Sequence, residues 1–187
     1  MTTNTFLLYG ANGYTGRLIA SLALQYQLKP ILAGRSREPL EVLAKELNLS
    51  YRIINLDDEK ALMDALKEVT LVLHAAGPFQ YTAKKMADAC IKTRTHYLDI
   101  NGDIAVFEML KKYNGLALEA GVMIMPGVGF DVVPTDCIAL KLKNKLPDAV
   151  KLELAFATLG GSLSHGTAIT MASKSGEGGA IRKNGKI

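Results

Sequence analysis

Three glycines near the N-terminus have the spacing of a turn that contacts phosphate. They belong to the segment Gly10-Ala11-Asn12-Gly13-Tyr14-Thr15-Gly16, which follows a short apolar run and precedes a helical pattern. Glycine allows a tight turn, leaves room for backbone to approach a pyrophosphate, and permits close packing of helix on strand. The following helix N-terminus offers unpaired N–H groups and a partial positive charge. The pattern predicts a dinucleotide-binding turn, with an ordinary strand-to-helix turn as the alternative.

The residues after the second apolar run indicate which dinucleotide is bound. NAD sites usually carry Asp or Glu at this place, where the carboxylate accepts a hydrogen bond from the ribose 2′-hydroxyl. This chain has Ala33-Gly34-Arg35-Ser36 instead. An arginine fork can bind a 2′-phosphate through two hydrogen bonds, and a serine hydroxyl adds another donor. We therefore predict NADP as the cofactor, bound by Arg35 and Ser36; a solvated surface arginine is the plainer alternative.

Two further segments are expected to line the cofactor. Asp57 follows the third predicted strand and could approach the adenine edge, while Asp58 suits the N-cap of the next helix. Ala76, Gly77 and Pro78 follow the fourth predicted strand. Small residues there would let the backbone approach the nicotinamide half, and the proline ring fixes the turn. Ligands of such sheets bind outside the carboxyl ends of the strands.

Few residues are candidates for a catalytic role. Tyr81 and Lys85 have the Tyr-x-x-x-Lys spacing of short-chain dehydrogenases, but there the pair follows the fifth strand, so we interpret the match as coincidence. Tyr81 could still orient a substrate. Asp99, Asp103 and Asp131 lie near the ends of the fifth and sixth predicted strands, where carboxylates could bind an amine or relay protons. A helix cap at Asp103 and a turn role for Asp131 are the structural alternatives.

Histidines and cysteines do not have the spacing of a metal site, so no metal is expected. His74 lies within an apolar run and is interpreted as a core residue, and His96 as an anchor of the short fifth strand. Cys90 and Cys137 fall in predicted helices, which indicates reduced core thiols in a cytosolic protein.

Six short apolar runs alternate with helical patterns up to about residue 146. The runs are 6–9, 30–33, 51–54, 71–75, 96–100 and 122–125. One helix is expected through Phe107, Leu110 and Ala117, and the last helix should start near Pro134. Alternating strands and helices are typical of a parallel sheet. Six such units predict an α/β fold with a doubly wound parallel sheet, the Rossmann arrangement.

The pattern changes after Pro147. We expect a dinucleotide-binding domain at 1–147 and the beginning of a second, incomplete α+β domain at 148–187. A strand is expected at 150–158, a helix at 166–174 and the start of a hairpin at 182–187. An unfinished strand leaves an edge that can pair with another chain, which predicts a homodimer through residues 148–187.

Composition narrows the class of protein. The 187 residues are 49% hydrophobic and 21% charged, which excludes wholesale disorder. The net charge is +4, and the excess lies at 141–187, which hold 8 basic and 3 acidic side chains. Because the main domain has no basic excess, nucleic acid is not an expected partner. No leader pattern and no run of about 20 apolar residues occurs, so we expect a cytoplasmic protein without a membrane span.

Taken together, these segments resemble the saccharopine dehydrogenase-like oxidoreductases, a family with an NADP-binding Rossmann domain. The matching stretches are Tyr9–Gly16, Ala33–Ser36, Ala76–Phe79 with Tyr81, His96–Asp99 leading to Gly102-Asp103, and Pro126–Asp136. The resemblance implies that the first three stretches hold the cofactor. It also implies that the last stretch leads into a substrate domain, of which this sequence holds the beginning.

The predicted function is NADP-dependent hydride transfer to or from a carbonyl, imine or enoyl substrate of unknown identity. The alternative from another class is a non-catalytic NADP-binding module or dimer scaffold. A third reading is an atypical short-chain dehydrogenase or sugar-nucleotide epimerase. That reading requires a serine and Tyr-x-x-x-Lys after the fifth strand, and the sequence has none there.

Overall fold

The computed structural model describes residues 5–155, 157, 159–160, 165–173, 175–176 and 181. The chain divides into two compact units, Met1–Ala155 and Phe156–Ile187. The first unit holds the sheet, and the described residues of the second form one helix, α8 (His165–Ser173). The domain boundary expected at residue 147 stays a prediction, since a compact unit need not be a domain that folds alone.

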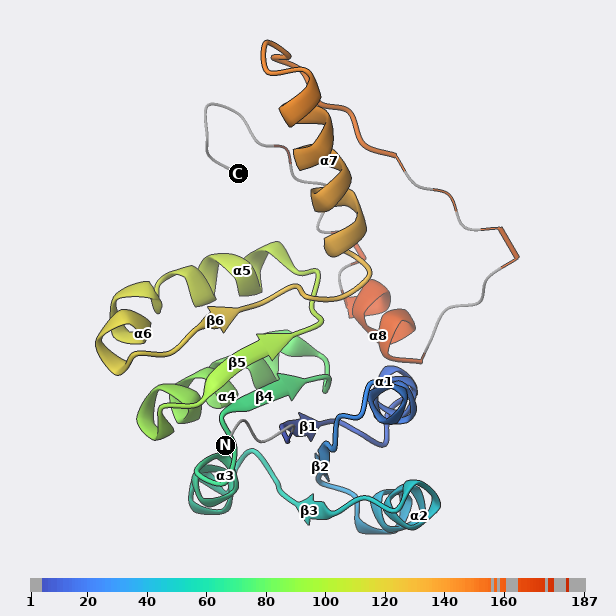
Figure 1. The fold of residues 1–187 in the computed structure, drawn as a ribbon, viewed down its shortest axis with the longest axis vertical. Helices are drawn as coiled ribbons and strands as arrows, with labels where there is room; N and C mark the ends of the chain where they lie inside the picture. The colour runs from blue at the N-terminus through green and yellow to red at the C-terminus, as the bar shows by residue number, and fades with distance from the viewer. Residues whose placement is uncertain are drawn as a thin grey trace. The chain divides into compact units, whose positions relative to one another are not determined.

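Six parallel strands form one sheet in the order β3-β2-β1-β4-β5-β6 (Figure 1). They are β1 (Leu7–Tyr9), β2 (Ile31–Gly34), β3 (Tyr51–Ile53), β4 (Leu71–His74), β5 (His96–Asp99) and β6 (Ile124–Met125). The central strand is β1, where Leu8 pairs with Leu32 of β2 and with Leu73 of β4. The order reverses between β1 and β4, as in a doubly wound sheet, so the predicted fold class is confirmed.

The described residues of the first unit form seven helices. They are α1 (Tyr14–Gln25), α2 (Arg37–Leu47), α3 (Glu59–Leu66), α4 (Phe79–Thr93), α5 (Ile104–Lys111), α6 (Asn114–Ala120) and α7 (Val133–Lys145). Asp58 caps α3 by accepting a hydrogen bond from the Ala61 N–H at 3.0 Å, as predicted. Helix α7 starts beside Pro134, also as predicted. None of the helices in the described ranges is long and apolar enough to cross a bilayer.

The side chains of β1 alternate between two cores because successive residues of a strand point to opposite faces. Leu7 and Tyr9 pack with residues of α3, α4 and α5, while Leu8 packs with residues of α1 and α2. All three side chains are buried. Helices therefore cover both faces of the sheet, and the carboxyl end of β1 is held firmly where the glycine turn begins.

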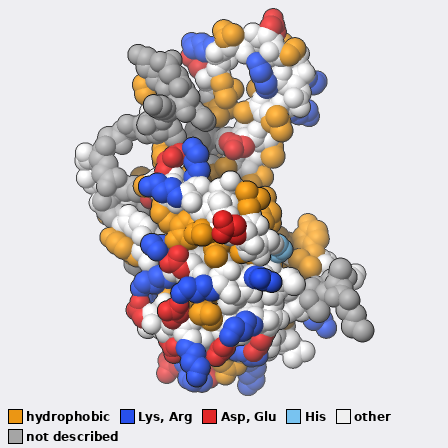
Figure 2. All heavy atoms as spheres, turned by 90° about the vertical axis from the view of Figure 1, so that its left-hand side faces the viewer, with side chains coloured by type: hydrophobic (Ala, Val, Ile, Leu, Met, Phe, Trp, Pro, Cys, Tyr) orange, Lys and Arg blue, Asp and Glu red, His pale blue; other side chains and the backbone are white. Residues whose placement is uncertain are grey.

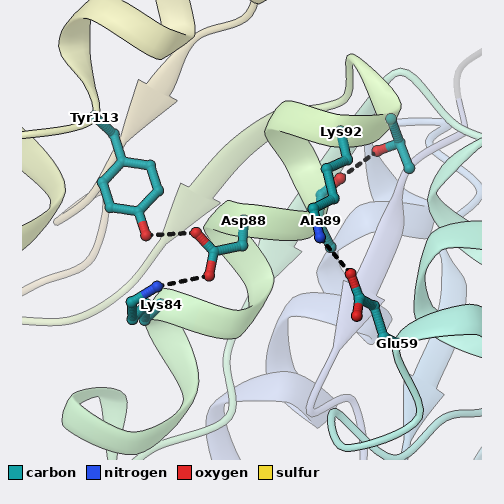
Figure 3. A network of polar contacts seen from close by, with 7 residues as sticks. Glu59, Lys84, Asp88, Ala89, Lys92 and Tyr113 are labelled. Atoms are coloured by element: carbon teal, nitrogen blue, oxygen red, sulfur yellow. Dashed lines mark hydrogen bonds and ion pairs between the residues drawn. The ribbon is translucent and has the colours of Figure 1, made fainter.

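Helix α4 is fixed to its neighbours by polar contacts, which Figure 3 shows. Asp88 accepts hydrogen bonds from Lys84 at 2.8 Å and from the Tyr113 hydroxyl at 2.5 Å. One turn further along, Lys92 forms an ion pair with Glu59 of α3. Partial burial raises the pKa of Asp88, but the hydrogen bonds it accepts outweigh this effect and leave the pKa lowered. The contacts of Asp88 and Lys92 thus tie α4 to Tyr113 and to α3.

Three sequence-based expectations are wrong. The helix expected through Phe107 and Ala117 is two helices, α5 and α6, because the chain turns before Asn114. Residues 150–155 and 157, expected within a strand, form none, since no described segment offers them a partner strand. Cys137, expected in the core, is exposed, whereas Cys90 is buried. The hairpin expected at 182–187 lies outside the described residues.

Candidate cofactor site

The parallel sheet brings the carboxyl ends of β1, β2 and β4 to one edge. At this edge Tyr9 of β1 pairs with Ala33 of β2 and with His74 of β4. Beyond these residues the chain turns into α1, α2 and α4, respectively. Connections leave the sheet in opposite directions where the strand order reverses, and ligands of doubly wound sheets bind at this point.

The turn from β1 into α1 has room only for glycine at two positions. The Gly10 N–H donates to the Ala33 carbonyl at 2.8 Å. Gly10 has a φ of +86°, and a Cβ on it would lie 2.8 Å from the carbonyl carbon of Ala75 and from the nitrogen of Ala76. A Cβ on Gly16 would lie 2.2 Å from the Gly10 carbonyl oxygen. The shape of the turn therefore depends on these two glycines.

Helix α1 begins without a side chain to cap its first N–H groups. Its N-cap is Gly13, and its first turn contains no acidic residue. Gly13, Tyr14 and Thr15 are exposed. The Arg17 side chain donates a hydrogen bond to the Asn12 carbonyl at 3.3 Å, which stabilises the turn. A diphosphate would supply acceptors to the exposed N–H groups and would match the positive end of the helix dipole.

Arg35 lies directly after β2, and its exposed guanidinium has no ion pair or hydrogen bond within the part of the chain that the structure describes. In contrast, Arg37 forms an ion pair with Glu41 at 3.0 Å. Ser36 is the N-cap of α2, but its hydroxyl makes no capping hydrogen bond. Burial raises the pKa of Tyr9, and the positive charge of Arg35 acts against this increase. Arg35 is thus within electrostatic reach of the end of β1.

Asp57 is exposed after β3 and forms an ion pair with Lys85 of α4. Its backbone N–H donates to the Asn55 side chain at 3.1 Å. The ion pair joins residues 28 positions apart, and neither local sequence carries a signal for it. The sequence singled out Lys85 only for its spacing from Tyr81, so its position beside Asp57 was not predicted. Contact of Asp57 with adenine stays a prediction.

The segment after β4 packs directly against the glycine turn. The backbone of Ala75 and Ala76 occupies the space that a Cβ on Gly10 would need. The Gly77–Pro78 peptide bond is cis. The Thr82 hydroxyl of α4 donates to the Ala76 carbonyl at 2.8 Å. The structure thus places the segment expected at the nicotinamide half beside the turn expected at the diphosphate.

His74 and His96 have structural positions, as predicted. His74 is fully buried, with its ring centroid 5.5 Å from that of Tyr9 and 5.3 Å from that of Phe79. Burial lowers the pKa of His74 to about 3, so the ring is neutral near pH 7. His96 Nδ1 accepts a hydrogen bond from the Met123 N–H at 3.0 Å and so anchors β5. Among the described residues, no cluster of His, Cys, Asp and Glu could hold a metal ion.

Tyr81 lies on the first turn of α4 and is 68% exposed. Its hydroxyl makes no hydrogen bond to any described residue. Lys85, its partner in the Tyr-x-x-x-Lys spacing, is engaged by Asp57. The arrangement therefore does not form the acid–base pair of a short-chain dehydrogenase, and Tyr81 remains only a candidate for orienting a substrate.

Buried Asp99 joins the ends of β5 and β6. Its carboxylate accepts hydrogen bonds from the Tyr97 hydroxyl at 2.5 Å, from the Asn101 N–H at 3.0 Å and from the Gly127 N–H at 2.8 Å. Burial, and after it the negative charge of Asp99, raises the pKa of Tyr97. With its oxygens occupied and no exposed surface, Asp99 supports the edge of the sheet and is not placed to react with a substrate.

The other two candidate carboxylates, Asp103 and Asp131, differ in their surroundings. Asp103 accepts a hydrogen bond from the Ala105 N–H at 3.0 Å and caps α5, which confirms the structural alternative. Asp131 is exposed and lies beside Gly102, where an added Cβ would be 3.2 Å from the Asp131 carboxylate. The fold thus brings the Asp103 loop and Asp131 together, as the sequence predicted for the ends of these strands.

Comparison with known proteins identifies the family of this chain. A family model described as the saccharopine dehydrogenase NADP binding domain matches residues 6–125. The chain belongs to this family. The resemblance stated from the sequence is thereby confirmed, and NADP is confirmed as the cofactor of the domain. The matched range includes the glycine turn, Arg35 and the segment 76–78.

Relatives and solved structures agree with this assignment. The chain is 28% identical over 173 residues to a saccharopine dehydrogenase-like oxidoreductase of Bos taurus, which covers 82% of this chain and 40% of the relative. It is 29% identical over 148 residues to a trans-acting enoyl reductase of Mycobacterium leprae, which covers 75% of this chain and 35% of the relative. An apo saccharopine dehydrogenase (L-Glu forming) from Saccharomyces cerevisiae shares the fold. Its TM-score is 0.64 at 19% identity, over 78% of this chain and 32% of the yeast chain. The chain thus spans about two fifths of the length of the curated relatives it matches.

Proposed function

We propose that residues 10–16 bind the diphosphate of NADP(H), that Arg35 and Ser36 bind its 2′-phosphate, and that residues 76–78 line its nicotinamide half. Asp57, held by Lys85, contacts the adenine edge. The protein to which the domain belongs is an oxidoreductase that acts on a carbonyl, imine or enoyl group. The enoyl option is supported by the printed name of the mycobacterial relative.

The proposal depends most on the unpaired guanidinium of Arg35 beside the glycine turn. The N–H groups of Gly10 and Ala11 both donate to the Ala33 carbonyl, at 2.8 and 3.2 Å, so the turn is tied to the strand that carries Arg35. An exposed arginine without a carboxylate partner is suited to the additional phosphate that distinguishes NADP from NAD. Backbone N–H groups at the start of α1 are suited to the diphosphate.

The residues proposed to face the substrate are Tyr81 and Asp131. When bound, the cofactor supplies or accepts a hydride at C4 of its nicotinamide ring. The exposed Tyr81 hydroxyl would donate a hydrogen bond to the substrate, and the exposed Asp131 carboxylate would accept one. Asp103 is given no such role because its carboxylate caps α5.

Replacement of Arg35 tests the cofactor assignment. We expect Arg35→Ala to weaken NADPH binding roughly 30-fold and to leave NADH binding nearly unchanged, since only NADPH has the 2′-phosphate. Arg37→Ala is the matched control, because Arg37 lies two residues away and is paired with Glu41. Dissociation constants come from NADPH and NADH fluorescence titrations. Equal losses for both coenzymes, or an equal loss in Arg37→Ala, would contradict the assignment.

A non-catalytic NADP-binding module is the second candidate. This function is favoured because the Asp99 and Asp103 carboxylates already accept structural hydrogen bonds. Of the carboxylates predicted from the sequence as catalytic candidates, only Asp131 is then left among the described residues. A panel of carbonyl, imine and enoyl substrates, assayed by NADPH oxidation, separates the two functions. Tight NADPH binding without turnover of any member would favour the binding module.

We further propose a homodimer through residues 148–187 and a cytoplasmic location. The expected strand edge is not formed by the described residues, but Val150, Leu152 and Leu154 are exposed, by 100%, 58% and 51%. A second copy could cover this apolar surface. Light scattering should give the mass of a dimer, and a monodisperse monomer would contradict it. Cell fractionation tests the location.

A further inference from the structure

The Thr82 hydroxyl lies at the centre of a small hydrogen-bond network between β4 and α4. Its Oγ1 is 2.8 Å from the Ala76 carbonyl oxygen, 3.3 Å from the Pro78 carbonyl oxygen and 3.0 Å from His74 Nε2. A hydroxyl has one hydrogen to donate, and the carbonyls can only accept. The short contact therefore assigns the Thr82 hydrogen to Ala76, and His74 Nε2 must be the donor to Thr82.

This assignment defines the tautomer of His74, with the hydrogen on Nε2. Its ring is fully buried beside the rings of Tyr9, Phe79 and Tyr97. Nδ1 carries the lone pair and has no hydrogen-bond partner among the described residues. The hydrogen bond to Thr82 is thus the one polar contact of the ring that the structure describes. It orients the Thr82 hydroxyl toward Ala76 rather than toward Nε2.

The position of Ala76 matters because its backbone touches the glycine turn. A Cβ on Gly10 would lie 2.8 Å from the Ala76 nitrogen, so the two segments lie closer than a residue with a Cβ permits. Movement of Ala76 would change the space between the residues proposed to hold the diphosphate and the nicotinamide half. Thr82 thus donates to the segment whose backbone lies against the glycine turn.

We propose that Thr82, oriented by His74, is a positioning residue that holds the segment 76–78 against Gly10 and sets the affinity for the nicotinamide half of NADP(H). The inference rests on the proposed function. It concerns only one half of the cofactor. Arg35 follows β2 and Thr82 follows β4, and these strands flank β1 on opposite sides. The adenosine half should therefore not depend on Thr82.

Replacing Thr82 by valine removes the hydroxyl at nearly constant shape. The His74 N–H and the Ala76 carbonyl then lose their partner in a part-buried place, which favours displacement of the segment. Helix α4 itself should stay in place, because Ala83 and Met86 are buried in the core and Lys92 pairs with Glu59. The effect is expected to remain local.

The test compares the whole cofactor with its adenosine half. NADPH and adenosine 2′,5′-bisphosphate are titrated by calorimetry into the wild-type chain, Thr82→Val, Thr82→Ser and Thr93→Val. Thr93 is the matched control, since it lies in the same helix but its hydroxyl donates to the Ala89 carbonyl of α4, at 2.8 Å, and not to the segment 76–78. We expect Thr82→Val to weaken NADPH roughly tenfold and to leave the bisphosphate within about twofold. Thr82→Ser should restore NADPH binding, and Thr93→Val should match the wild type.

Unchanged NADPH binding in Thr82→Val would overturn the inference, and so would an equal loss for the bisphosphate or a Thr82→Ser variant as weak as valine. If Thr82→Val does not fold, Thr82→Ala is judged by the same ratio between the two ligands. A wild-type chain that binds neither ligand would overturn the proposed function itself, and this result is seen before any variant is measured.

Discussion

Acidification should destabilise this domain through one buried side chain, His74. Burial lowers the pKa of this imidazole to about 3, whereas its ordinary value is 6.5. Between these values the unfolded chain binds a proton that the folded chain does not. The contribution of His74 to the free energy of unfolding is therefore complete above about pH 6.5 and is lost as the pH falls toward 3.

The expected loss is large compared with the stability of a domain. At pH 5, which is about 1.5 pH units below the unfolded value, a slope of ~1.4 kcal/mol per pH unit gives about 2 kcal/mol. Native domains are stable by only about 5–15 kcal/mol. The burial of His74 should thus be visible in an ordinary denaturation experiment.

The assay is urea denaturation followed by circular dichroism at pH 7.5 and pH 5. His74→Gln is the reference variant, because its amide can donate to Thr82 in place of Nε2 but does not titrate. Other groups that titrate are present in both proteins, so the difference between the two pH effects isolates His74. The reasoning is refuted if the wild type and His74→Gln lose the same free energy of unfolding between the two pH values.

Two further substitutions test the edge of the sheet. Gly10→Ala should cost ~1–2 kcal/mol from its positive φ alone and more from contact with Ala75 and Ala76, and it should abolish NADPH binding. Gly115→Ala in α6, with no atom within 4 Å of the new Cβ, should leave NADPH binding unchanged and should not lower the free energy of unfolding, since alanine is the better helix former. Urea denaturation with NADPH titration checks both, and near-wild-type behaviour of Gly10→Ala would count against the close approach. Asp99→Asn should lower the free energy of unfolding by about 3 kcal/mol, because the new amide opposes donors that the carboxylate accepted. Asp103→Asn should be nearly neutral, since asparagine is also a good N-cap, and equal effects of the two variants would contradict the roles assigned.

The sequence predicted the parts of the fold that local patterns determine. The apolar runs around β1 to β6 and the glycine pattern at residues 10–16 carry short-range signals, and the strand order follows from the doubly wound arrangement. The N-caps at Asp58 and Asp103 are likewise local, because each side chain bonds a backbone N–H two or three residues later. These elements could be identified without knowing any contact between distant segments.

The features that were missed depend on contacts between distant segments. The helical pattern from Phe107 to Ala117 continues across the turn at Tyr113, whose hydroxyl bonds to Asp88, 25 residues earlier. Alternating apolar residues at 150–154 satisfy the strand pattern, but a strand also needs a neighbour to accept its hydrogen bonds. The Asp57–Lys85 ion pair likewise has no trace in either local sequence.

The most direct test of the cofactor site is a crystal structure of this chain with NADP⁺. We expect diphosphate oxygens at about 2.7–3.2 Å from the N–H groups of the first turn of α1, and the 2′-phosphate in hydrogen-bond contact with the Arg35 guanidinium. A dinucleotide bound elsewhere on the sheet, or a 2′-phosphate in solvent with Arg35 turned away from it, would contradict the account.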